Sequence, residues 1–476
     1  MKPIEVCSLR GHLNDITCTE PYYSAENVSL ISADSKGWII WWDINTRRPN
    51  CVWKGHDSNI VTIRQICNGL LLTHSKDSDI KIWDIEKFKD GSREMPAEKY
   101  NSVQYFNVGD AEENDNILKN ELLEKFPLPE HTVIPVNALN YCNVDYSNYH
   151  LITPATTDSN NFDLYLIFKP SDQNDQSLEE KLNLKRVATS VDPWKLYKKT
   201  INHLNKEQGV ESEIGNEDDI LKRDRFGIMM KVMFVGDDLF YIGYESGHLI
   251  GFHIDFSGVT NNEKKEPTPH STKPNKNVSG LSGLLGSKSK KSFDRTIINK
   301  DPEIKVVYIN DSCSPNPILS LEVDKVGNRI ICGSTGKQLT FHEIPHEFSH
   351  FREAKDCESY NLRHSGIQSI SVNHSLLVVG FWDGIIKGYN RDINEVFKYS
   401  KRLPRIDVLE SNNGQVQPHE RESSMRLCTT KLVMPKETLK VSTKDYKSLI
   451  KRKRDITTAN LLISSYYDGT ITIFKI

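Results

Sequence analysis

A pattern of alternating apolar and polar residues recurs along the chain, and each copy begins at a turn. A turn residue, usually followed by Gly, precedes an aliphatic residue three positions later and a large ring six positions later. Asp and Gly favour tight turns, and alternation places successive side chains on opposite faces of a strand. The pattern therefore predicts a strand that begins at a tight turn and buries its ring. Its copies are Lys36–Asp43, Asp77–Asp84, Ser246–Phe252, Gly336–His342, Asp383–Tyr389 and Asp468–Phe474, with His342 as the ring of the fourth.

Short apolar segments precede every copy and predict further strands. They span residues 28–32, 70–74, 239–242, 329–332, 376–380 and 461–464. Two copies also show an earlier strand, at residues 60–63 and 367–372. A strand, a loop, a strand, a turn and a strand make up most of a four-stranded β-propeller blade. The repeat therefore predicts six blades.

The first two copies carry the fuller signature of a WD repeat. Each opens with Gly-His, at Gly11 and Gly55, and closes with Trp-Asp, at Trp42 and Trp83. The two tryptophans lie 41 residues apart, within the range of about 40–45 residues for such a blade. The sequence thus predicts WD-repeat blades in particular.

Four polar or aromatic residues of the second copy predict a buried hydrogen-bond relay. They are His56, Ser75, Asp77 and Trp83. A His-Ser-Asp set could also be a hydrolase triad, but a triad is defined by geometry and roles rather than by residue types. Because Ser75 and Asp77 flank one turn and Trp83 completes the repeat, we interpret the set as structural.

A seventh blade is expected in the 169 residues between Trp83 and Phe252. The segments 103–106, 136–142, 149–153 and 164–168 could supply its strands. The N-terminal segment 4–9 reads as a strand that precedes the first Gly-His, so it is free to pair into the last blade and close the ring. Closure removes the open edges that promote aggregation. We therefore predict an all-β fold, with residues 1–476 forming one seven-bladed β-propeller.

Long polar insertions account for the rest of the chain. Seven blades of about 42 residues would use only about 294 residues. The approximate insertions are residues 107–130, 171–228, 257–300 and 403–458, and a helix is expected at 177–184. Surface insertions of this length cost a fold little free energy.

Composition and charge narrow the class of protein. Hydrophobic residues make up 37 % of the chain, and 61 basic against 64 acidic residues give a formal charge of −3. This balance excludes binding of nucleic acid through overall positive charge. No apolar run approaches the roughly 18 residues of a membrane span, and no signal-peptide pattern opens the chain. The nine scattered cysteines, without a C-x-x-C pair, predict reduced thiols and no structural zinc site.

One short motif matches a zinc-protease signature. His342, Glu343 and His346 fit H-E-x-x-H, and His350 extends the spacing. The chemistry requires both histidines on one face of a continuous helix. Here His342 ends a predicted strand, and Pro345 opposes a helix. We interpret the match as accidental, and we predict no catalytic residue, metal or cofactor.

Basic clusters lie in two of the insertions. The cluster of Lys451, Arg452, Lys453 and Arg454 could direct nuclear import, as could the weaker cluster at residues 288–291. Direct nucleic-acid binding is not favoured, because no aromatic residues are interleaved with these basic residues.

The order of these motifs resembles that of a known family. The matching pieces are Trp42–Arg48, Ser75–Ile85, Gly243–Gly247, Gly333–Lys337, Gly380–Gly384 and Tyr467–Gly469. They resemble the ASTRA-associated protein family, whose animal relatives are guanine-nucleotide-binding-protein-beta-like proteins. The resemblance covers the blades but not the insertions.

This resemblance implies a non-catalytic scaffold subunit in the nucleus. Its implied partners are the TTT cochaperone, the RuvB-like ATPases and a large PI3-kinase-like protein, with roles in kinase maturation and chromatin regulation. The alternatives are a propeller adaptor of another nuclear complex, a propeller enzyme that uses His342, Glu343 and His346, or a nucleic-acid-binding module.

Overall fold

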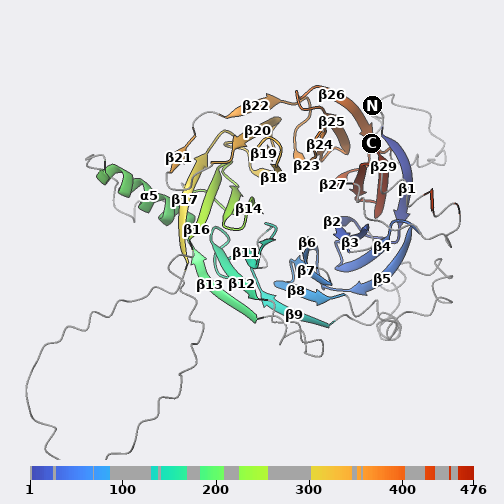
Figure 1. Cartoon of the computed structure of the whole chain (residues 1–476), viewed down its shortest axis with the longest axis horizontal. Helices are drawn as coiled ribbons and strands as arrows, with labels where there is room; N and C mark the ends of the chain where they lie inside the picture. Colours follow the sequence, from blue (N-terminus) through green and yellow to red (C-terminus); the bar gives the residue numbers. More distant parts are fainter. Residues whose placement is uncertain are drawn as a thin grey trace, which may run out of the picture.

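The strands form seven sheets, almost entirely antiparallel, that are arranged in a ring around a central axis (Figure 1). Cavities along this axis form the channel described below. This computed structural model describes residues 3–24, 28–67, 69–85, 130–137, 141–168, 183–207, 225–255, 302–345, 351–354, 357–402, 424–434, 447, 450–451 and 459–476. The first strand of each sheet lies nearest the channel. The prediction of a seven-bladed β-propeller is confirmed.

The blades are numbered from the N-terminus. Blade 1 contains β2 (Ile16–Tyr23), β3 (Val28–Asp34), β4 (Trp38–Asp43) and β5 (Arg48–Lys54). Blade 2 contains β6 (Ile60–Cys67), β7 (Leu70–Ser75), β8 (Asp79–Asp84) and β9 (Glu130–Pro135). Blade 3 contains β10 (Asp145–Ser147), β11 (His150–Pro154), β12 (Phe162–Phe168) and β13 (Asn183–Val191).

The remaining blades follow the same plan. Blade 4 contains β14 (Met229–Phe234), β15 (Leu239–Tyr244), β16 (Leu249–Asp255) and β17 (Glu303–Asn310), with a fifth strand, β21 (Arg352–Glu353), parallel to β17. Blade 5 contains β18 (Ile318–Asp324), β19 (Arg329–Ser334), β20 (Gln338–Glu343) and β22 (Glu358–Asn361). Blade 6 contains β23 (Ile367–Val372), β24 (Leu377–Phe381), β25 (Ile385–Tyr389) and β26 (Glu395–Ser400).

Blade 7 joins the two ends of the chain. It contains β27 (Leu427–Val433), β28 (Leu461–Tyr466), β29 (Thr470–Lys475) and, on its outside, β1 (Ile4–Arg10). β1 is antiparallel to β29, with Ile4 opposite Lys475 and Arg10 opposite Thr470. The predicted closure by the N-terminal strand is confirmed, and it leaves the ring without a gap between first and last blade (Figure 1).

Glycines in the turns bring the backbones of neighbouring blades together. Gly37, Gly384 and Gly469 have φ values of 87°, 85° and 72°. A Cβ atom at these positions would collide with the carbonyl oxygens of His56, Met425 and His12, each in the next blade around the ring. The turn glycine of the repeat is therefore required both by its left-handed conformation and by the contact between blades.

Two predicted insertions contain propeller strands. β13 and a helix, α5 (Pro193–Glu207), fall within 171–228, and β27 falls within 403–458. The prediction of a helix at 177–184 is wrong for residues 183 and 184, which begin β13. Residues 177–182 lie outside the described residues. In the range 107–130 only Glu130 is described, as the start of β9, and 257–300 lies outside the described residues.

The third blade has four described strands, and the described residues of segment 136–142 are not in any of them. Of segment 136–142, residues 136, 137, 141 and 142 are described, and they belong to the connection from β9 to β10. Segment 103–106 lies outside the described residues. The fourth strand is β13, which pairs with β12.

α5 was not predicted, although its start has a clear signal. Asp192 accepts hydrogen bonds from the backbone N–H groups of Trp194 and Lys195, and Pro193 occupies the first helical position. Trp194 and Tyr197 pack their rings against Phe226, with centroid distances of 5.2 and 5.8 Å. The helix is thereby attached to blade 4, beside β17 (Figure 1).

The closing strand offers a direct test of what the ring contributes to stability. Leu9 is 2 % exposed and packs in the core shared by blades 1 and 7, whereas Ile4 on the same strand is 66 % exposed. Leu9→Ala should lower the free energy of unfolding by about 2–5 kcal/mol, because a buried cavity is created. Ile4→Ala should change it by less than about 0.5 kcal/mol. Denaturant titration of both variants checks this, and equal losses would contradict it.

Candidate functional site in the central channel

A hydrogen-bond relay crosses blade 2, but Thr73 occupies the place predicted for Ser75. His56 Nδ1 lies 2.9 Å from Asp77 Oδ2, and His56 Nε2 lies 2.7 Å from Thr73 Oγ1. The indole N–H of Trp83 donates to the same Thr73 oxygen at 2.8 Å. Ser75 instead donates to the carbonyl oxygens of Ser58 and Asn59. The relay thus joins His56, Asp77 and Trp83 through Thr73.

Protonation states follow from this network. Burial lowers the pKa of His56, although Asp77 opposes the shift. Burial is the largest single influence on the pKa of Asp77 and raises it. The interaction with His56 and the hydrogen bonds from the backbone N–H groups of Asp57 and Asp79 together outweigh burial, and the pKa falls to about 2. Neutral His56 therefore donates from Nδ1 to the Asp77 carboxylate and accepts at Nε2 from the Thr73 hydroxyl. None of His56, Thr73 and Asp77 lines either of the two cavities described below.

Blade 1 contains an equivalent relay that the sequence analysis missed. His12 contacts Asp34 at 3.0 Å and Ser32 at 2.8 Å, and Trp42 donates to Ser32 at 2.8 Å. In both blades the hydroxyl residue precedes the tryptophan by ten positions. That fixed offset was the signal that could have identified Ser32 and Thr73.

The H-E-x-x-H motif is not arranged as a zinc-protease site. His342 lies on β20, a strand, and is 1 % exposed. Its ring nitrogens contact Tyr308 Oη at 2.9 Å and Thr340 Oγ1 at 2.8 Å. Glu343 is exposed, and His346 and His350 lie outside the described residues. The described part of the chain contains no group of three or more His, Cys, Asp or Glu placed to hold a metal ion.

Of the predicted basic clusters, the structure describes only Lys451. Residues 288–291 and Arg452, Lys453 and Arg454 lie outside the described residues, and Lys451 is exposed. Among the described helices none is long and apolar enough to span a membrane. None of the nine cysteines forms a disulfide bond.

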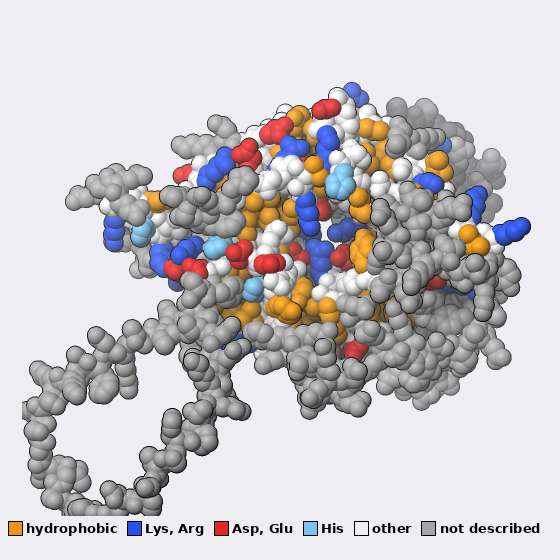
Figure 2. Space-filling view, in the orientation of Figure 1, with side chains coloured by type: hydrophobic (Ala, Val, Ile, Leu, Met, Phe, Trp, Pro, Cys, Tyr) orange, Lys and Arg blue, Asp and Glu red, His pale blue; other side chains and the backbone are white. Residues whose placement is uncertain are grey.

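The channel is lined by charged residues of alternating sign. Six blades each supply one, from the strand nearest the channel, and blade 6 supplies Ser371. In ring order they are Glu20, Arg64, Asp145, Lys231, Glu322 and Lys431. Figure 2 shows acidic and basic side chains gathered around the hollow at the centre of the ring.

A regular register produces most of this arrangement. The fifth residue of the inner strand is Glu20 in β2, Arg64 in β6, Glu322 in β18, Ser371 in β23 and Lys431 in β27. The first residue of each of these strands is a fully buried Ile or Leu. The signal was therefore present in the sequence as an apolar residue followed four positions later by a charged or polar one.

Ion pairs connect four of the six charged residues. Arg64 lies 3.3 Å from Glu20 and 3.0 Å from Asp145, measured between nitrogen and oxygen atoms. Lys431 lies 4.0 Å from the other oxygen of Glu20. Asp145 also accepts a hydrogen bond from the backbone N–H of Phe234 at 2.7 Å. The carboxylate of Asp145 raises the pKa of Arg64, so Arg64 keeps its positive charge.

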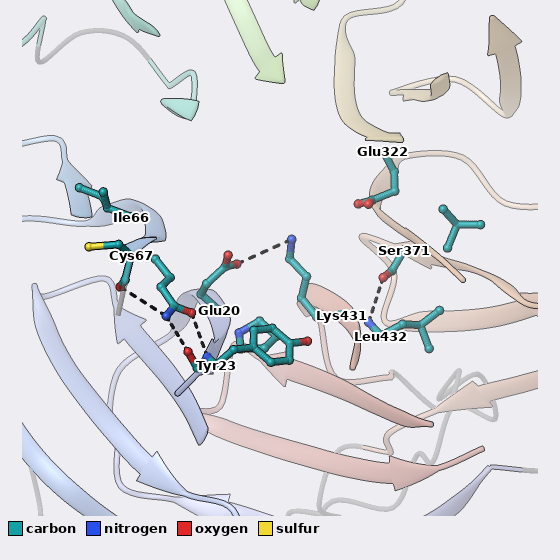
Figure 3. A pocket seen from close by; sticks show the side chains of 11 residues that line it. Glu20, Tyr23, Ile66, Cys67, Glu322, Ser371, Lys431 and Leu432 are labelled. Carbon is teal, nitrogen blue, oxygen red and sulfur yellow. Dashed lines mark hydrogen bonds and ion pairs between the residues drawn. The ribbon is translucent and has the colours of Figure 1, made fainter. Parts of the chain in front are cut away.

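Glu322 faces this network from across the channel. Its carboxylate points into the cavity on the side of Lys431 opposite Glu20 (Figure 3). Burial raises the pKa of Glu322, and the charges of Lys431 and Arg64 only partly oppose the shift. Two cavities meet at this level, with volumes of about 550 and 490 Å³, and Glu322 lines both.

Exposed aromatic residues surround one mouth of the channel. Tyr141 is 62 % exposed, Trp382 is 40 % exposed, and both line the larger cavity together with Tyr467. Lys76 Nζ lies 3.6 Å from the centre of the Tyr141 ring. Exposed aromatic side chains beside a charged cavity are typical of surfaces that bind other proteins. The channel and this mouth form the candidate functional site.

Comparison with known proteins identifies the family. Residues 5–474 match the family described as ASTRA-associated protein 1. An ASTRA-associated protein 1 from Debaryomyces hansenii is 77 % identical over the whole of both chains.

The chain belongs to the ASTRA-associated protein 1 family.

More distant relatives and a solved structure agree with this membership. The ASTRA-associated protein 1 of Meyerozyma guilliermondii is 36 % identical, again over the whole of both chains. The β-propeller domain of Cps50 (Swd1) from Myceliophteria thermophila has a TM-score of 0.50 at 10 % identity, covering 100 % of this chain and 99 % of that one. At that identity the solved structure supports the propeller fold of this ASTRA-associated protein 1 family member and nothing more.

Thr73 provides a test of the relay in this ASTRA-associated protein 1 family member. Thr73→Val removes the oxygen that contacts His56 and Trp83, and each buried polar group left without a partner costs about 1–3 kcal/mol. Thr73→Ser keeps the oxygen, as Ser32 does in blade 1, and should cost roughly 1 kcal/mol for the lost methyl group. Thermal and denaturant unfolding compare the two, and a Val variant as stable as the Ser variant would refute the relay.

His342 predicts a specific pH dependence of stability. Burial lowers its pKa from 6.5 to about 3. Between these values the unfolded chain binds a proton that the folded chain does not, so stability falls as the pH drops below 6.5. From pH 7 to pH 5 this residue should account for a loss of about 2 kcal/mol.

The matched comparison is His342→Phe. It places at position 342 a large aromatic ring, as most other copies of the repeat have at the equivalent position. Unfolding free energies at pH 7 and pH 5 should differ less in this variant than in the wild type. His203→Phe, on an exposed position of α5, should keep the wild-type difference. An unchanged pH dependence in His342→Phe would show that His342 is not the source.

Proposed function

We propose that this protein is a non-catalytic scaffold subunit of an ASTRA-like assembly. The observation that carries the proposal is the family match over almost the whole chain, together with relatives named ASTRA-associated protein 1. A closed ring of seven blades supports it, because such a ring holds its surface loops on a rigid frame. The buried residues His12, His56 and His342 take part in hydrogen bonds within the blades, which also favours a scaffold.

The finer proposal concerns partners and location. The family resemblance makes the TTT cochaperone, the RuvB-like ATPases and a PI3-kinase-like protein the expected partners, with a role in maturation of such kinases and a link to chromatin regulation. The basic residues 451–454 support a nuclear location. The aromatic mouth of the channel is the described surface best suited to protein contacts, since it exposes the rings of Tyr141 and Trp382 beside charged side chains.

Affinity purification with mass spectrometry tests this proposal. The tagged full chain is expressed at its native level and recovered separately from nuclear and cytoplasmic extracts. Subunits of the cochaperone and the RuvB-like ATPases should be enriched at least tenfold over a control, and more strongly from the nuclear extract. An unrelated seven-bladed propeller with the same tag is the control.

The outcomes separate the alternatives. Recovery of a different nuclear complex would replace the family-specific part and keep the scaffold role. Recovery of nucleic acid that is lost when residues 451–454 are neutralised would favour a nucleic-acid-binding module. Recovery of none of these partners would refute the proposal.

A further inference from the structure

Lys231 stands apart from the other charges of the channel. It is the third residue of β14, whereas the charged residues of β2, β6, β18 and β27 are the fifth of their strands. The third residues of the other long inner strands are all small: Cys18, Thr62, Ser320, Ser369 and Thr429. A single long cation therefore reaches into a layer of the channel that is otherwise lined by small side chains.

Within the described part of the chain, Lys231 has no ionic partner. No carboxylate lies within ion-pair distance of its ammonium group, while Glu20 and Asp145 are both engaged by Arg64. Its pKa is lowered by burial, is raised by the Cys142 thiol, and is lowered further by the charges of Lys431 and Arg64. Lys231 is half-buried and lines a cavity, so its ammonium group is partly desolvated and offers a bound anion a cation that no carboxylate already engages.

The cavity beside Lys231 has the size and charge to accept an anion. It measures about 550 Å³ and opens at the aromatic mouth of the channel. Four cations line it (Arg64, Lys76, Lys231 and Lys431), against three lining carboxylates (Asp15, Glu20 and Glu322). The Asp145 carboxylate, which pairs with Arg64, balances the fourth cation, so the cation available to an anion is Lys231 and not an excess of charge in the whole cavity. Glu20 already forms ion pairs with Arg64 and Lys431. Asp15 and Glu322 are the lining carboxylates that take no part in the ion pairs of the channel. An anion at Lys231 would also be attracted by the nearby positive charges of Arg64 and Lys431.

We propose that this cavity binds a compact oxyanion, a phosphate or a carboxylate, with the ammonium group of Lys231 as its main ligand. Lys231 donates charge-assisted hydrogen bonds to the anion, while Arg64 and Lys431 stabilise it by their field. The anion can be a free phosphate or an acidic side chain of a partner that enters through the aromatic mouth. This proposal does not depend on membership of an ASTRA-like assembly.

The test measures the unfolding temperature of the purified full chain in a chloride buffer. Inorganic phosphate, acetate and the peptide acetyl-Gly-Glu-Gly-amide are added separately, with sodium chloride matching the ionic strength. Ligands that bind the folded state raise the unfolding temperature with concentration. If phosphate alone raises the unfolding temperature, the natural ligand is a free phosphate. If the peptide raises it at a lower concentration than acetate does, the natural ligand is an acidic side chain of a partner.

Variants assign the effect to Lys231. Lys231→Met should weaken binding by at least about tenfold, as expected for loss of a charge-assisted hydrogen bond. The same variant should fold at least as stably as the wild type in chloride, because an unpaired charge is removed. Lys231→Arg should retain binding, and Lys325→Met, at an exposed turn, should leave it unchanged. No response to any of the three anions, or an equal response in Lys231→Met, would overturn the proposal.

Discussion

The pairing of β1 with β29 is the interaction on which the rest of the structure depends. Every blade packs against two neighbours, and only this pairing gives blade 7 its outer strand from the other end of the chain. Once the ring is closed, its radius is fixed and the seven inner strands are held at set positions around one axis. The alternating charges of the channel are a consequence, because Glu20 and Lys431 become neighbours only when blades 1 and 7 meet.

The sequence predicted the fold where the information is local. A turn, a strand and a buried ring within a few residues define most blades, and a tight turn recurs at a regular interval. Prediction failed where a blade is assembled from distant pieces. β9 follows β8 after a long segment, and β13 follows β12 after another. No tight turn therefore joins either strand to the one before it, and the sequence pattern used to predict the other strands is missing. The predicted insertions were consequently too wide.

The candidate site was harder to predict for a different reason. Thr73 and Ser75 both face the interior, and only the offset from the tryptophan, seen in two blades together, distinguishes them. The channel residues are separated by up to 411 positions in the chain, from Glu20 to Lys431. Their alternation of sign is a property of the ring and not of any segment. A single sequence shows each charge beside an apolar strand but does not show which charges face one another.

The fifth strand of blade 4 has a consequence for how the propeller meets other proteins. Among the described blades, β17 is the outer strand that another strand covers, since β21 pairs with it and α5 packs beside it. The part of its main-chain hydrogen-bonding edge at Tyr308 and Ile309 is thus already used by the chain itself. A partner peptide that docks by adding a strand to a sheet finds less free edge on blade 4 than on a blade whose outer strand is uncovered. The propeller's circumference is therefore not seven equivalent docking positions.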